Sequence, residues 1–137
     1  MQQPLLNTNG DIINHNAAAL AFLGDAVYEL LVREYLLSAD GGRIGDLHQK
    51  KTGLVNSRAQ YQAVQVLDEH LTNEEKTIFK RGRNADVRHI PKNAERMQYH
   101  YATGLESLFG YLYLMQNMAR IKELFMLIIN NSELKSD

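Results

Sequence analysis

Apolar residues recur at helical spacing over most of the chain, and no stretch keeps the two-residue alternation of a half-buried strand. We therefore predict an all-α fold, in one domain over residues 1–137 whose core spans about 15–130. Thr72 and Glu75 match a capping box, which marks one helix start. Six helices are expected, over about residues 16–37, 44–51, 52 or 53 to 67–70, 72–84, 92–116 and 118–129.

The first helix carries one acid, Asp25, in an otherwise apolar run. One predicted stripe contains Leu20, Leu23, Val27, Leu30 and Leu31, and the opposite side holds Asp25 with Ala18, Ala21, Phe22, Glu29 and Val32. Because neither side carries Lys or Arg, this helix is expected to be buried on most sides. A carboxylate in such a place must be protonated, paired or bound to a cation.

A second acid, Glu106, lies beside an apolar stripe in the predicted helix 92–116. Gly110, one turn later, is expected to leave open space next to this carboxylate. If the two helices pack together, Asp25 and Glu106 are placed to share one hard cation, and Mg²⁺ suits a site with few carboxylates. The alternative is that each acid hydrogen-bonds a buried hydroxyl or a helix N-terminus.

Basic charge is concentrated in residues 80–100, which hold six Lys and Arg against two acids, whereas the whole chain has a net charge of −1. A basic segment on an acidic body indicates a localised anion-binding site. The candidates for contacts with a phosphate backbone are Lys80, Arg81, Arg83, Asn84 and Lys92. The alternative is an ordinary solvated surface loop.

Several classes of site have no support in the sequence. The chain has no cysteine, so disulfides and thiolate metal sites are excluded. No His-x-x-x-His pair, phosphate-binding glycine loop or nucleophile elbow occurs, so neither zinc nor a nucleotide cofactor is expected. The N-terminal residues do not resemble a signal peptide, and no apolar run reaches the ~18 residues that cross a membrane.

Two motifs resemble those of a known family. Phe-Leu-Gly-Asp-Ala-Val at 22–27 is similar to the signature helix of ribonuclease III domains, and Glu-Ser-Leu-Phe-Gly at 106–110 is similar to their second acidic motif. The resemblance is closer to the Mini-III branch, which has no double-stranded-RNA-binding domain. Supporting similarity extends over residues 20–36, 54–57, 81–85, 91–93 and 99–114.

The resemblance implies a helical, symmetric homodimer that cleaves double-stranded RNA in the cytoplasm. Such enzymes use Mg²⁺, with Mn²⁺ as a substitute, and leave 5′-phosphate ends. Mini-III enzymes are associated with maturation of large-subunit (23S) ribosomal RNA precursors. By this resemblance Asp25 and Glu106 are the catalytic metal ligands. The basic segment at residues 80–100 binds the RNA.

The sequence departs from the longer ribonuclease III proteins at two positions. Ala21 and Thr103 stand where those proteins have further acids. The Mini-III branch resembles this chain in having fewer acids, so activity is still expected. A single metal ion, with an RNA phosphate completing its ligands, is expected in place of a two-metal site. The loss of two acids also keeps an alternative open, a non-catalytic RNA-binding or ribosome-associated scaffold on the same fold.

Overall fold

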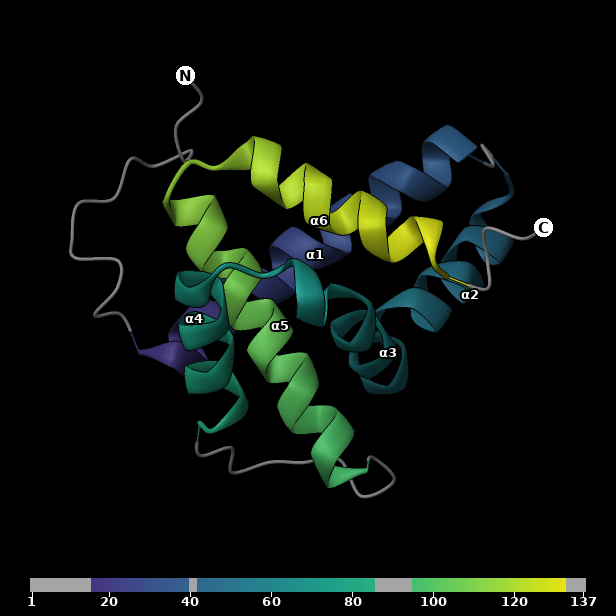
Figure 1. The fold of residues 1–137 in the computed structure, drawn as a ribbon. Helices are drawn as coiled ribbons and strands as arrows, with labels where there is room; N and C mark the ends of the chain where they lie inside the picture. Colours follow the sequence, from purple (N-terminus) through teal and green to yellow (C-terminus); the bar gives the residue numbers. More distant parts are fainter. Residues whose placement is uncertain (1–15, 40–41, 86–94, 133–137) are drawn as a thin grey trace.

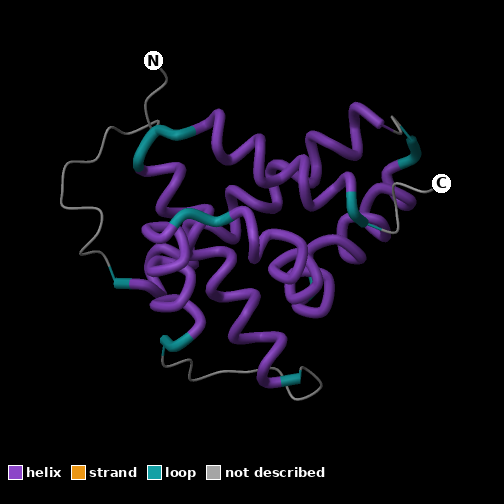
Figure 2. Tube along the Cα trace, viewed as in Figure 1, coloured by secondary structure: helices purple, strands orange, loops and turns teal. Residues whose placement is uncertain are grey.

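A computed structural model describes residues 16–39, 42–85 and 95–132. Every regular element among them is a helix, which confirms the predicted all-α class (Figure 2). No helix in these three ranges is long and apolar enough to cross a membrane. The elements are α1 (Ala17–Ala39), α2 (Ile44–Val55), α3 (Ser57–Leu67), the 3-10 helix η2 (Asp68–His70), α4 (Asn73–Arg83), α5 (Arg96–Leu114) and α6 (Met118–Asn130).

Helix α5 is the centre of the fold, with α3 and α4 on its two sides and α1 and α6 also packed against it (Figure 1). From position 102 to position 112 every residue of α5 except Glu106 is buried. The helix expected to be buried on most sides was α1, and that prediction is wrong for the single chain. Apolar residues on its outer face misled the prediction, because a helical wheel cannot distinguish apolar residues in a core from exposed ones.

Helix α1 has one buried face and one exposed face. Its buried residues are Leu20, Ala21, Gly24, Tyr28, Val32 and Leu36. Phe22 and Leu30 are instead 84% and 67% exposed, so the predicted stripe is wrong at Leu30. Asp25 is exposed as well.

The boundary between α2 and α3 lies at Asn56, three or four residues later than the predicted start at residue 52 or 53. Asn56 has an extended backbone, and its side-chain oxygen accepts a hydrogen bond from the backbone N–H of Ala59 at 2.8 Å, which caps α3. Its amide also donates to the carbonyl of Thr52, so the cap is anchored on α2. Gly53 is accommodated inside α2, where nothing lies near its missing side chain.

The predicted capping box at the start of α4 is confirmed, with both Thr72 and Glu75 bonded as the motif requires. Glu75 is almost fully buried, and Arg120 of α6 binds both of its carboxylate oxygens at 2.8 Å. The Arg120 side chain also donates to the carbonyl of His70 at 2.7 Å. Although burial alone would raise the pKa of Glu75, its hydrogen bonds to Arg120 and Thr72 outweigh burial and lower it. This cluster joins α4, α6 and the 3-10 turn.

Candidate active site

The two acids meet because α1 and α5 cross with their backbones in contact. A side-chain carbon at Gly24 would overlap the carbonyl oxygen of Glu106, and one at Gly110 would overlap the carbonyl oxygen of Leu20. Only glycine allows so close an approach. The open space expected beside Gly110 is therefore absent, because the backbone of α1 fills it.

Asp25 and Glu106 lie within hydrogen-bonding reach of each other across this crossing. Asp25 is exposed, whereas Glu106 is largely covered. Burial, followed by the negative charge of Asp25, raises the pKa of Glu106 from 4.5 to about 8. Burial and the nearby charge of Glu106 also raise the pKa of Tyr28, which lies on the buried side of α1. Ionising both acids would therefore place two negative charges in a small, partly desolvated volume, and Glu106 resists this by keeping its proton.

A third polar group completes the site from α3. The side-chain nitrogen Nε2 of Gln60 lies 3.4 Å from Oε2 of Glu106 and donates to it. This hydrogen bond opposes the rise in the pKa of Glu106. Gln60 was not among the predicted site residues. The signal for it is a polar side chain at a core-facing position, within the apolar spacing of positions 60, 63, 64 and 67.

The residues present fit a hard divalent cation. Carboxylate oxygens are the ligands that Mg²⁺ prefers, and a positive charge would relieve the repulsion between Asp25 and Glu106. Within the described part of the chain, no group of three or more His, Cys, Asp or Glu could hold a metal. Glu29, one turn after Asp25, is occupied by a salt bridge to Arg33 at 2.7 Å. The two carboxylates thus suit one ion that keeps most of its waters.

Of the predicted phosphate-contact residues, Lys80, Arg81 and Arg83 lie together at the C-terminal end of α4 and Asn84 is its C-cap, whereas Lys92 lies outside the described residues. Gly82, in their midst, packs against Gly104 and Ser107 of α5, two positions before and one after Glu106. The basic end of α4 therefore abuts the same segment of α5 as the acid pair. A pocket here is lined by Arg83, Asn84, Arg96, Met97, His100 and Tyr101.

Arg83 is held in place by its neighbours. Its guanidinium carbon lies 5.9 Å from the ring centroids of both Phe79 and Tyr101, and its Nε donates to the side chain of Asn84 at 3.1 Å. Cation–aromatic contacts of this kind orient a guanidinium without neutralising it. Together with Arg96, Arg83 gives the pocket two positively charged guanidinium groups.

The raised pKa of Glu106 predicts how stability depends on pH. Its folded pKa of about 8 exceeds the ordinary value of 4.5, so the folded state binds the extra proton between these values. Without metal, the free energy of unfolding should fall as pH rises from about 5 to 8, by several kcal/mol at roughly 1.4 kcal/mol per pKa unit. Denaturant unfolding at each pH measures this fall. Glu106→Gln should flatten it, and an unchanged slope in that variant would contradict the raised pKa.

Comparisons with known proteins match the chain to one family. The family model described as "Ribonuclease III domain" matches residues 18–117. A Mini-ribonuclease 3 of Enterococcus faecalis is 44% identical over 111 residues, covering 80% of this chain and 84% of that protein. The Mini-ribonuclease 3 of Clostridium tetani is 38% identical over 124 residues, covering 90% and 82%. A crystal structure of a Fusobacterium nucleatum protein superposes with a TM-score of 0.80 at 33% identity, covering 89% of this chain and 98% of that one.

Proposed function

The chain belongs to the ribonuclease III family, as an endoribonuclease of the Mini-ribonuclease 3 type, and from this premise we propose that it cleaves double-stranded RNA with the aid of Mg²⁺. The observation that carries the proposal is the contact of Asp25 with Glu106 where α1 crosses α5. Precursors of large-subunit (23S) ribosomal RNA in the cytoplasm are the proposed substrate. Mn²⁺ is expected to substitute for Mg²⁺.

In the proposed mechanism, Asp25 and Glu106 are the residues that would hold one Mg²⁺ ion. When bound, Mg²⁺ activates water for attack on phosphorus and stabilises the charge that develops on the phosphate. Glu106 must lose its proton to serve as a ligand, so ion binding and proton release are coupled. Breaking the bond from phosphorus to the 3′ oxygen leaves 5′-phosphate and 3′-hydroxyl ends.

The basic end of α4 supports the proposed grip on RNA. Lys80 and Arg83 lie on α4, whose Gly82 packs against α5 near Glu106, and Arg96 lines a pocket with Arg83 at the start of α5. Contacts to phosphates position a duplex without reading its sequence. The affinity should therefore depend strongly on salt and little on base sequence.

We predict that Lys80→Ala and Arg96→Ala each weaken duplex RNA binding and lower the slope of log affinity against log salt by about 1, because each removes one phosphate contact. Filter binding in EDTA measures this without cleavage. Lys122→Ala, on the exposed side of α6, is the matched control and should leave the slope unchanged. Equal slopes for all three variants would count against the proposed RNA surface.

The exposed face of α1 supports a homodimer. Phe22, Leu30 and Leu37 are 84%, 67% and 62% exposed and share one side of the helix. An exposed apolar face of this kind is energetically unfavourable in water. Pairing with the same face of a second protomer would cover it. If two α1 helices pair antiparallel about Leu30, Phe22 of one protomer meets the other near Leu37.

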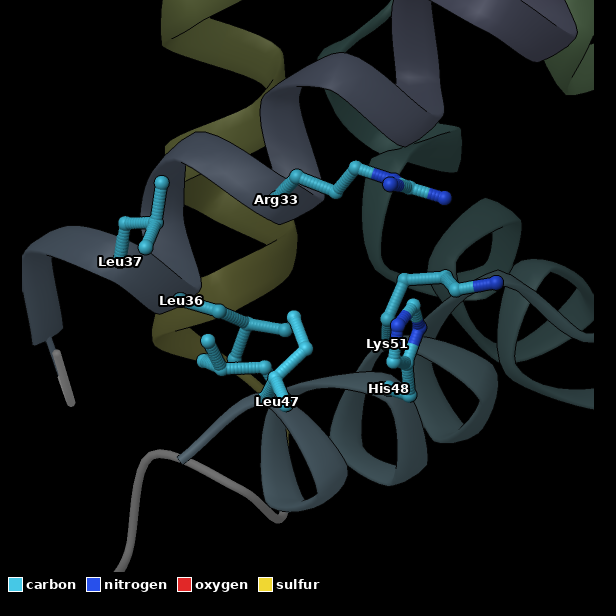
Figure 3. Close-up of a pocket in the computed structure, with 7 residues that line it drawn as sticks. Arg33, Leu36, Leu37, Leu47, His48 and Lys51 are labelled. Carbon is cyan, nitrogen blue, oxygen red and sulfur yellow. The ribbon is translucent and has the colours of Figure 1, made fainter. Parts of the chain in front are cut away.

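A pocket at that end of α1 is consistent with this pairing (Figure 3). Leu36 of α1 and Leu47 of α2 point toward each other in it, and Arg33, His48 and Lys51 border it. A dimer would carry two acid pairs, one for each strand of an RNA duplex. The molar mass in solution tests it, with twice the mass of one chain expected.

The proposed function is tested by incubating a long duplex RNA with the protein in Mg²⁺ or in excess EDTA, with duplex DNA alongside. We expect cutting of the RNA alone, and only with metal. Salt-sensitive binding of RNA with no cutting would overturn the proposal. It would favour the alternative, an RNA-binding scaffold.

A further inference from the structure

Gln60 is a polar residue on the apolar face of α3. The buried residues of that helix are Gln60, Ala63, Val64 and Leu67, the spacing of a single core-facing stripe. Gln60 is only 1% exposed. An amide buried this deeply is costly unless it is hydrogen-bonded, and an apolar residue of similar size would avoid the cost. Packing alone therefore does not explain a glutamine at this position.

The carboxylate of Glu106 is the partner of Gln60. The Gln60 amide presents its NH₂ group to Glu106, with Nε2 3.4 Å from Oε2. This donor suits the ionised carboxylate that binds a metal, which accepts hydrogen bonds and does not donate them. Gln60 reaches Glu106 from α3, whereas Asp25 reaches it from α1. Glu106 is thus contacted from two different helices.

The donor sits on a firmly placed element. Asn56 caps the first turn of α3 and is itself bonded to Thr52 of α2, and the far end of α3 is buried at Leu67. Gln60 lies one turn from this capped N-terminus of α3, so the backbone that carries its side chain is held in place. This is the property required of a group that orients a metal ligand.

We propose that Gln60 is a positioning residue for the metal site, restricting the carboxylate of Glu106 to one orientation beside Asp25. The inference rests on the proposed function, since it takes the acid pair to bind a divalent cation. Groups that hydrogen-bond a metal ligand commonly affect metal affinity by 10- to 100-fold. The deletion of this one hydrogen bond should therefore weaken metal binding without changing the fold.

The test compares Gln60→Met with wild type. Methionine keeps the length and volume of the side chain and lacks the NH₂ donor. Titration with Mn²⁺ alone, followed by electron paramagnetic resonance without RNA, should show roughly 10- to 100-fold weaker binding. Gln60→Asn has a side chain one methylene shorter, which withdraws the amide from Glu106. This variant should weaken Mn²⁺ binding to a similar extent. Gln65→Met, on the exposed side of α3, is the matched control and should bind Mn²⁺ as wild type does.

Circular dichroism and thermal unfolding of the metal-free variants separate positioning from a structural role. The proposal is supported if both Gln60 variants stay folded and lose affinity, and if cleavage recovers at high Mg²⁺. Wild-type Mn²⁺ affinity in either folded variant overturns it. Failure of the wild-type protein to bind Mn²⁺ overturns both proposals. If wild type binds Mn²⁺ and cuts no duplex RNA, only the nuclease proposal falls.

Discussion

Asp25→Asn should reduce cleavage of duplex RNA by about a thousandfold or more while leaving the protein folded. The substitution keeps the size of the side chain and removes one of the two charged ligands proposed for the metal. Losing about 4 kcal/mol of transition-state stabilisation corresponds to a factor of about a thousand. Initial rates under saturating Mg²⁺ measure the effect.

The stability of the same variant distinguishes loss of the site from loss of the fold. Removing the charge of Asp25 removes one of the causes that raise the pKa of Glu106. The metal-free variant should therefore unfold at pH 8 with a free energy equal to or higher than wild type. Glu34→Gln, an exposed acid on the same helix, should keep full activity. Wild-type cleavage by Asp25→Asn would remove Asp25 from the proposed site.

Gly24→Ala should destabilise the protein by about 3 kcal/mol or more, at the severe end of overpacking. The added carbon would overlap the backbone carbonyl of Glu106, and a backbone cannot rotate away as a flexible side chain can. The helices must separate, which also moves Asp25 from Glu106. Urea unfolding measures the stability, and Mn²⁺ titration of whatever remains folded should show weaker binding.

A matched substitution on α2 has the opposite expected sign. Gly53 is also a glycine inside a helix, and nothing lies within 4 Å of the carbon that alanine would add there. Gly53→Ala should stabilise the protein by about 0.5–1 kcal/mol through helix propensity alone. If both substitutions stabilised the protein, the close crossing of α1 and α5 would be refuted.

The features predicted correctly from the sequence are local ones. The start of α4 follows from Thr72 and Glu75, because a capping box involves only neighbouring residues. The extent of α1 and α6 follows from helical spacing and the turn residues that flank them. One non-local feature was predicted conditionally, namely that Asp25 and Glu106 lie close together if their helices pack. The structure brings the two acids together, and their role as metal ligands stays a prediction.

The features that were missed depend on the partners of each helix. A helical wheel cannot show that Phe22 and Leu30 are exposed in the single chain. The pattern of apolar residues is the same whether a core or a second chain covers them. The close approach at Gly110 was mistaken for open space because the backbone that fills it is far away in the sequence. Gln60 was missed for the same reason, as its partner lies 46 positions later.

The crossing of α1 and α5 also governs when the site can exist during protein synthesis. Asp25 and Glu106 are separated by 81 positions, so at about 5–20 residues per second the ribosome makes the second acid roughly 4–16 s after the first. Until α5 has emerged, α1 has no buried helix to dock on, and no acid pair forms. A chain synthesised only as far as α4 therefore lacks the acid pair, and the proposed metal site can assemble only after α5 has emerged.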